Sequence, residues 1–233
     1  TLKAAFNCSI TIPAGIVTMI RDWDETALLL APAGQRGERF AHDSELPAGN
    51  ELELGGLRWQ ALAAPGHDMH ALMFHCASED ILISGDALWQ DGFGVVFGEL
   101  LGQPEALRAT RQTLAAIAAL DVRTVIPGHG APFTDVAGAL ARANRRLDGY
   151  ESNRTRLARN AIKALLTFNL LDHQQLRLDS LPDYLQSLPF FIDICRQLGL
   201  PPATNVVDWL VEELLRARAI ELRDGWIVPL MAA

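Results

Sequence analysis

The sequence contains no long hydrophobic run, no closely spaced cysteine pair and no excess of basic charge. Its apolar runs, such as residues 27–32 and 81–83, fall far short of the roughly 20 residues that a membrane-spanning helix needs. The cysteines Cys8, Cys76 and Cys195 are far apart, which indicates free thiols in a reducing compartment and predicts a cytoplasmic location. The formal net charge of −8 opposes binding to nucleic acids and to anionic membranes.

The composition is that of a folded globular protein. Of the 233 residues, 49% are hydrophobic and 21% are charged, so a substantial core can form and intrinsic disorder is excluded. This length accommodates one large domain, or a medium domain with a small one.

The first part of the chain, up to about residue 132, shows short β-type runs with one amphipathic helix. The helix is expected over residues 104–120, between the last two strands. Gly55 and Gly56 separate two of the runs at the distance of a tight hairpin, which favours an antiparallel meander. The expected strands are 9–13, 27–31, 51–54, 57–64, 70–76, 80–84 and 123–127.

After residue 133 the pattern becomes helical. Residues 1–135 carry 8 basic and 17 acidic side chains, whereas residues 136–233 carry 12 and 11. We therefore place a domain boundary near residue 150, with domains 1–150 and 151–233. A hairpin over 219–229, turning at Asp224 and Gly225, gives the second domain the layout of a winged helix. The expected helices are 135–149, 154–171, 181–198 and 205–220.

Three short motifs place a metal-capable side chain where a strand ends in a glycine-containing loop. Imidazoles and a carboxylate suit zinc or a similar first-row ion, and one carboxylate can bridge two ions. Each motif alone is a weak signal, because an isolated histidine after a turn is usually a surface or core residue. The informative feature is the ordered set Pro65-Gly66-His67, Ser84-Gly85-Asp86 and Pro127-Gly128-His129.

The strings PGHD (65–68), ILISGDALW (81–89) and VIPGHG (125–130) resemble the C-terminal two-thirds of the metallo-β-lactamase fold. Within that superfamily the chain looks most like glyoxalase II-like bacterial hydrolases, some of which carry a winged-helix tail. This resemblance implies an α/β fold, an αββα sandwich followed by a small helical domain. It also implies a site for two divalent ions, zinc or alternatively iron or manganese. His67 matches a histidine of the first metal site, Asp86 the bridging aspartate and His129 the last histidine of the second site.

One departure from the family pattern concerns the signature His-x-His-x-Asp-His, which is absent from the chain. Residues 2–10 resemble the segment that follows this signature, so the missing piece is expected just before Thr1. The sandwich would then be incomplete, and self-association could cover an exposed sheet edge. With so few ligands left, we expect this chain to be inactive, with no metal bound as an open alternative.

In an intact site the resemblance implies a metal-activated hydroxide that attacks a small thioester, ester or lactone. His70 is a candidate catalytic residue that orients the substrate, with packing at the strand start as the alternative. Asp68 is a candidate substitute ligand. Trp89, Phe93 and Phe97 follow Asp86 and are candidates for an apolar substrate pocket, although they could equally cap the core.

Two function classes besides the hydrolase stay open. A metal-free scaffold or interaction protein would keep the fold and the helical tail without the chemistry. A metal-dependent nuclease would use the basic stretch between Arg142 and Lys163, for which a solvated helix face is the commoner explanation.

Overall fold

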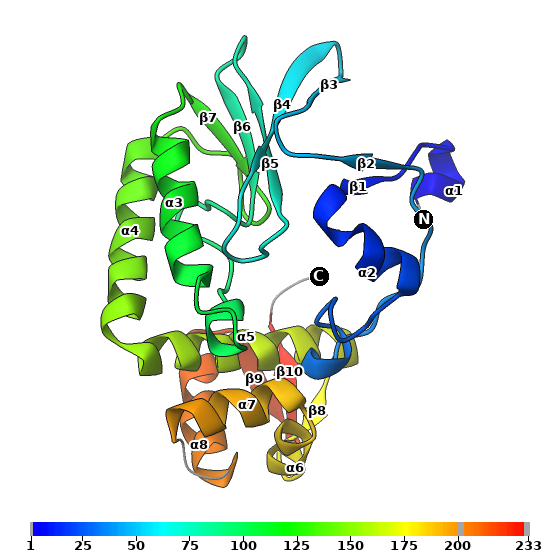
Figure 1. The fold of residues 1–233 in the computed structure, drawn as a ribbon. Helices are drawn as coiled ribbons and strands as arrows, with labels where there is room; N and C mark the ends of the chain where they lie inside the picture. The colour runs from blue at the N-terminus through cyan, green and yellow to red at the C-terminus, as the bar shows by residue number, and fades with distance from the viewer. Residues whose placement is uncertain (1, 200–202, 231–233) are drawn as a thin grey trace. The chain divides into compact units, whose positions relative to one another are not determined.

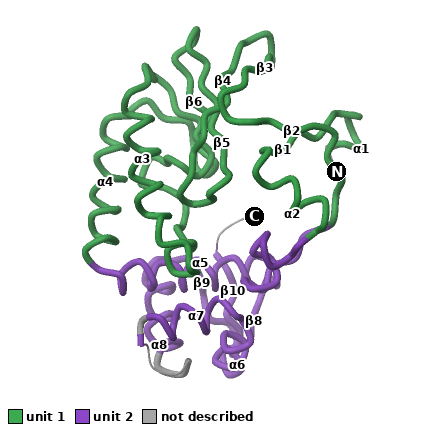
Figure 2. The backbone as a smooth tube through the Cα atoms, viewed as in Figure 1, with its two compact units in different colours: residues 1–23, 39–152 green, residues 24–38, 153–233 purple. Residues whose placement is uncertain are grey.

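The computed structural model describes residues 2–199 and 203–230, which divide into two compact units (Figure 2). The first unit contains the chain up to residue 23 and residues 39–152. The second contains residues 24–38 and the chain from residue 153 onwards. The domain boundary near residue 150 stays a prediction.

The first unit is built on a five-stranded sheet in the order β3-β4-β5-β6-β7. Neighbouring strands are antiparallel from β3 to β6, as the meander predicts, and β7 pairs with β6 in parallel. Gly55 and Gly56 have φ of 63° and 74°, the left-handed conformation that a two-residue hairpin turn requires. The strands are β3 (Glu51–Leu54), β4 (Leu57–Ala63), β5 (Leu72–Cys76), β6 (Ile81–Gly85) and β7 (Thr124–Pro127).

Two helices, α3 (Ala106–Ala118) and α4 (Val136–Ser152), lie side by side next to this sheet (Figure 1). α3 provides the long connection that a parallel pair such as β6–β7 needs. The side chains of Leu114 on α3 and Leu147 on α4 are almost fully buried. The predicted helix 104–120 and the mixed α/β class are therefore confirmed.

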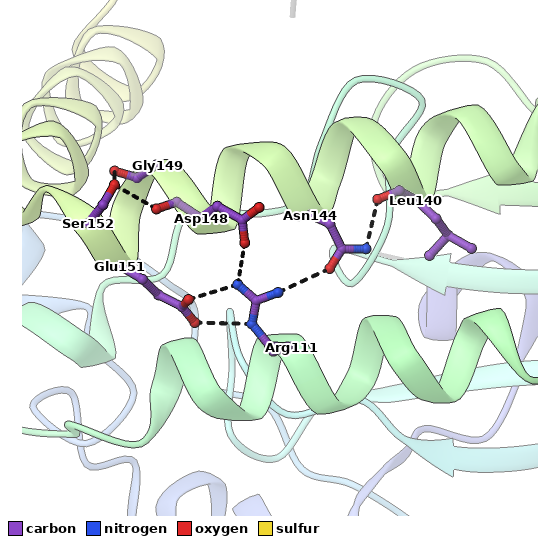
Figure 3. Close-up of polar contacts among 7 residues, drawn as sticks. All are labelled: Arg111, Leu140, Asn144, Asp148, Gly149, Glu151 and Ser152. Atoms are coloured by element: carbon purple, nitrogen blue, oxygen red, sulfur yellow. Dashed lines mark hydrogen bonds and ion pairs between the residues drawn. The ribbon is translucent and has the colours of Figure 1, made fainter.

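An arginine of α3 joins the two helices through a polar cluster (Figure 3). Arg111 donates to Asp148 at 2.6 Å, to Glu151 at 2.7 Å and 3.2 Å, and to Asn144 at 3.5 Å. Hydrogen bonds to Glu151 and then to Asp148 raise the pKa of Arg111 above its ordinary value. The guanidinium thus bridges α3 and α4 over about two turns of α4.

The chain before the sheet is more helical than expected. It forms α1 (Leu2–Phe6) and α2 (Val17–Asp22), and the strands β1 (Thr11–Pro13) and β2 (Ser44–Leu46), which pair in parallel. Short 3-10 helices cover Ala14–Ile16 and Ala31–Ala33 in this segment, and a third covers Gly98–Leu100 between β6 and α3.

The prediction of a strand over residues 27–31 is wrong, because local hydrogen bonds fold this segment into turns. The Asp24 carboxylate accepts from the backbone N–H groups of Thr26 and Ala27 at 3.0 Å, and its carbonyl accepts from Leu28 at 2.8 Å. The apolar pattern of residues 27–31 alone does not indicate that hydrogen bonds to Asp24 favour turns over a strand.

Within its described residues, the second unit packs four α-helices and a three-stranded sheet in the order β8-β10-β9. The helix expected over 181–198 is two helices, because Leu188 is extended before Pro189. The predicted hairpin is confirmed, with φ of 49° at Asp224 and 81° at Gly225. The elements are α5 (Arg154–His173), β8 (Leu176–Arg177), α6 (Leu181–Gln186), α7 (Pro189–Leu198), α8 (Ala203–Arg216), β9 (Ile220–Arg223) and β10 (Trp226–Pro229).

Residues 24–38 belong to the second unit because a buried amide on α5 binds them. Asn169 donates to the carbonyl of Ala33 at 2.9 Å and to that of Leu165 at 2.8 Å, and it accepts from the Tyr184 hydroxyl. All polar atoms of this fully buried side chain are thereby satisfied. Among the helices of residues 2–199 and 203–230, none has both the length and the apolar character for crossing a membrane.

The Arg111 cluster leads to a stability prediction. Arg111→Met removes the bridge between α3 and α4. Because the Arg111 side chain is 39% exposed, we expect the free energy of unfolding, measured with urea, to fall by about 1 kcal/mol. Arg108→Met is the matched control, since Arg108 pairs with Glu105 at the start of the same helix. An equal loss in both variants would show that the bridge between helices contributes nothing of its own.

A second prediction concerns pH and the first strand. Asp43 accepts from Lys3 at 2.6 Å and from the Ile10 backbone N–H at 2.8 Å, and these hydrogen bonds hold the pKa of Asp43 below its usual range. The stabilisation of the folded state by the Asp43 carboxylate is complete above the ordinary carboxyl pKa of about 4. It is lost as pH falls through the lowered pKa of Asp43. Amide exchange at Ile10, corrected for intrinsic rates, should show this loss of protection. Asp43→Asn should show weak protection at every pH, and a wild-type profile would contradict the assignment.

Candidate functional site

The three sequence motifs meet because the strands that precede them run in the same direction. β6 and β7 are parallel, and β4 is related to β6 through two antiparallel pairings. The carboxyl ends of all three strands therefore lie at the same edge of the sheet. His67 follows β4, Asp86 follows β6 and His129 follows β7.

Asp86 lies between the two histidines, with one carboxylate oxygen toward each. Its Oδ2 is 3.4 Å from His67 Nε2, and its Oδ1 is 3.8 Å from His129 Nε2. Asp86 and His67 are about one-third exposed, whereas His129 is 68% exposed. The cluster is thus open to a ligand on the side of His129.

A backbone carbonyl determines which nitrogen of His67 is free. His67 Nδ1 lies 2.7 Å from the carbonyl oxygen of Val95. Because a carbonyl only accepts, Nδ1 must carry the proton in this hydrogen bond, and Nε2 is the ring nitrogen that faces Asp86. This is the arrangement that orients metal-binding histidines in proteins.

Trp89 holds the other side of the carboxylate. Its indole Nε1 donates to Asp86 Oδ1 at 3.0 Å, and its ring meets the ring of His129 edge to face at 5.0 Å. One aromatic side chain thereby contacts both the central carboxylate and the exposed histidine.

Two glycines allow this close packing. A Cβ atom on Gly94 would lie 2.7 Å from the His67 ring and 2.8 Å from Asp86 Cβ, and one on Gly128 would lie 2.8 Å from Asp86 Oδ1. Sequence reasoning did not assign Gly94 or the Val95 carbonyl to the site. The only available signal was the glycine-rich composition of the loop after Asp86.

The imidazole nitrogens and carboxylate oxygens of this cluster are donors of the types that bind a divalent first-row ion, although they do not surround an ion position on all sides. Zinc holds nitrogen and oxygen at about 2.0–2.2 Å in tetrahedral geometry, which separates two donors by about 3.3–3.6 Å. The His67–Asp86 separation lies in that range and the His129–Asp86 separation slightly above it. Within the described residues, no three His, Cys, Asp or Glu side chains form a group that could hold an ion. The residues present are a partial ligand set.

His70 and Asp68 lie outside the cluster of His67, Asp86 and His129. His70 packs against Gly15, where a Cβ atom would come within 2.4 Å of its Nδ1. Asp68 Oδ1 accepts from the backbone N–H of His70 at 2.8 Å and so closes the turn before β5. The structure brings neither side chain to Asp86, and their predicted roles stay predictions.

The aromatic residues after Asp86 divide into two kinds. Phe93 and Phe97 are 1% and 8% exposed, and Phe93 meets Tyr150 of α4 edge to face. Their burial favours the alternative that they cap the core. Trp89 is half-buried beside Asp86, where a substrate can reach it.

A cavity of about 400 Å³ lies elsewhere in the first unit and shares no residue with the cluster. Arg21 at its wall is paired with Asp22, and Arg39 donates to the carbonyl of Arg21. The charge of Arg21 is thus compensated, and Arg39 is held by a backbone carbonyl. The cavity is lined by Ile20, Arg21, Arg39, Phe40, Ala41 and His42.

Three of the seven cations between Arg142 and Lys163 are engaged in ion pairs. Arg142 pairs with Asp135 and Asp91, and both Arg159 and Lys163 pair with Glu213. Side chains neutralised in this way contribute little to phosphate binding, which disfavours the nuclease hypothesis.

Comparisons with known proteins identify the family and the fold. The family model of the Metallo-beta-lactamase superfamily matches residues 2–129. A hydroxyacylglutathione hydrolase of Ectopseudomonas mendocina is 33% identical over 86 residues, which cover 36% of this chain and 32% of that protein. One from Xylella fastidiosa is 32% identical over 127 residues, 54% of this chain and 45% of the relative. The chain thus spans less than half the length of these relatives.

Solved structures show the same fold at low identity. A metallo-beta-lactamase family protein from Thermus thermophilus aligns with a TM-score of 0.50 at 19% identity, covering 97% of this chain and 74% of that chain. A beta-lactamase domain protein from Burkholderia ambifaria gives the same TM-score and identity over 94% and 64% of the two chains. The predicted resemblance and fold class are confirmed.

Proposed function

The chain belongs to the metallo-beta-lactamase superfamily, and we propose that it is a metal-dependent hydrolase of small thioesters, esters or lactones. The observation that carries this proposal is the Asp86 carboxylate, which presents one oxygen to each of two histidines. A thioester is the favoured substrate, because curated relatives are hydroxyacylglutathione hydrolases.

The residues that would hold metal follow from these pairings. His67 Nε2 with Asp86 Oδ2 would hold one divalent ion, and His129 Nε2 with Asp86 Oδ1 a second. Zinc suits this nitrogen and oxygen set best, with iron or manganese as alternatives. When bound, such ions supply a hydroxide nucleophile near neutral pH and polarise the substrate carbonyl.

The chain's own groups orient the site and meet the substrate. The Val95 carbonyl keeps His67 Nε2 available, and the Trp89 N–H holds Asp86 in place. The exposed edge of Trp89, beside His129, would contact the acyl group of the substrate. We keep His70 as a candidate for orienting the substrate, with a smaller expected effect because it packs on Gly15.

The remaining assignments belong to this proposal. Residues 1–150 would form the catalytic domain, and 151–233 a winged-helix-like domain with the β9–β10 hairpin as its wing. We propose a cytoplasmic protein that acts on a small molecule and forms a homo-oligomer. The competing class is a metal-free scaffold, which the partial ligand set favours.

Metal content and hydrolysis test the proposal together. The purified chain, loaded with zinc, iron or manganese, should retain metal after desalting, whereas little or no hydrolysis of a hydroxyacyl thioester is expected of it, because the ligands present are a partial set. Asp86→Asn should weaken metal binding about tenfold or more and remove any residual turnover, because both ion positions share that carboxylate. His42→Gln, a histidine outside the cluster, should change neither measurement.

Two results would contradict the proposal. A wild-type chain that retains no metal and hydrolyses none of the thioester, ester and lactone substrates is a scaffold. Metal retention that survives Asp86→Asn would place the ion elsewhere.

A further inference from the structure

A loop of residues 88–97, here named the site loop, follows Asp86 and returns to the cluster at three points. The Gly94 N–H donates to the Asp86 carbonyl at 2.8 Å, the Val95 carbonyl accepts from His67, and Trp89 donates to Asp86. Apart from the short bridge between Trp89 and Gly92, the loop has no regular secondary structure. Contacts from outside must therefore determine its position.

Arg146 on α4 supplies such contacts. Its guanidinium lies 5.2 Å from the centre of the Phe93 ring and 5.5 Å from that of Tyr150, a cation–π contact with each of two rings that also meet each other edge to face. Its Nη1 donates to the Phe93 carbonyl at 3.4 Å, and its Nε donates to the Tyr150 hydroxyl at 2.7 Å. A Cβ atom on Gly92 would lie 2.5 Å from Nη1, so the loop backbone lies directly on the guanidinium.

We propose that Arg146 is a positioning residue that, through the site loop, keeps His67 protonated on Nδ1 and its Nε2 free. The connection is short, because Arg146 binds the carbonyl of Phe93 and the carbonyl two residues later, that of Val95, binds His67. Loss of the guanidinium frees the loop to move away from the imidazole. The Val95 carbonyl then no longer selects the tautomer.

The role goes beyond packing because two features of the guanidinium matter together. Its delocalised charge contacts two aromatic rings, and its separate N–H groups reach the Phe93 carbonyl and the Tyr150 hydroxyl at once. Arg142, one turn earlier on α4, donates to the Gln90 carbonyl at 2.8 Å and holds the start of the same loop. The proposal concerns the part of the loop that reaches His67.

The first experiment measures the His67 tautomer in metal-free protein, from the ring ¹⁵N shifts at a pH where the ring is neutral. Wild type should be mainly the Nδ1–H form. Arg146→Met should shift His67 toward the Nε2–H form, and Tyr150→Phe, which removes one hydroxyl, should shift it in the same direction by less. Arg145→Met, an exposed neighbour on α4, is the matched control and should leave the tautomer unchanged.

The second measurement connects the tautomer to metal binding and rests on the proposed function. Arg146→Met should bind zinc about 10-fold to 100-fold more weakly in a chelator competition, the usual effect of removing a partner behind a metal ligand. Arg145→Met should bind zinc as wild type does.

The outcomes separate the two proposals. A folded Arg146→Met with an unchanged His67 tautomer overturns the positioning role, whatever its metal affinity. A tautomer shift in a chain whose wild type binds no zinc supports the positioning role and contradicts the proposed function. If Arg146→Met does not fold, Tyr150→Phe decides, and an unchanged tautomer there overturns the inference.

Discussion

The shared carboxylate of Asp86 is the feature on which the site depends. One carboxylate can face two imidazoles only if the three side chains leave the same edge of the sheet. The common direction of β4, β6 and β7 meets that requirement, and the parallel pairing of β6 with β7 depends in turn on α3 as the connection. The helix that completes the fold is therefore also a condition for the chemistry.

Orientation at the site comes from groups that bear no metal chemistry of their own. A carbonyl selects the tautomer of His67, an indole N–H holds Asp86, and two glycines leave room for both. Arg142 and Arg146 on α4 donate hydrogen bonds to the loop that follows Asp86. That loop carries three of these groups, namely Trp89, Gly94 and the Val95 carbonyl. Part of the basic stretch thus serves the interior of the first unit.

Much of this was accessible from the sequence. The alternation of apolar residues and the pair Gly55-Gly56 predicted the meander, and the three strand-end motifs identified His67, Asp86 and His129 as one set. The errors arose where a local backbone preference, set by a polar side chain or a proline, competes with an apolar pattern. Asp24 folds an apparent strand into turns, and Pro189 divides an apparent long helix.

The sequence by itself determined the order of the motifs and the fold class, because hydrophobic periodicity and turn glycines act over a few residues. Only the tertiary structure decided which oxygen of Asp86 faces which histidine and which nitrogen of His67 is free. It also decided that Phe93 lies in the core while Trp89 stays beside the site. These features depend on contacts between residues such as His67 and Val95, which lie 28 positions apart in the chain, and no local pattern encodes such contacts.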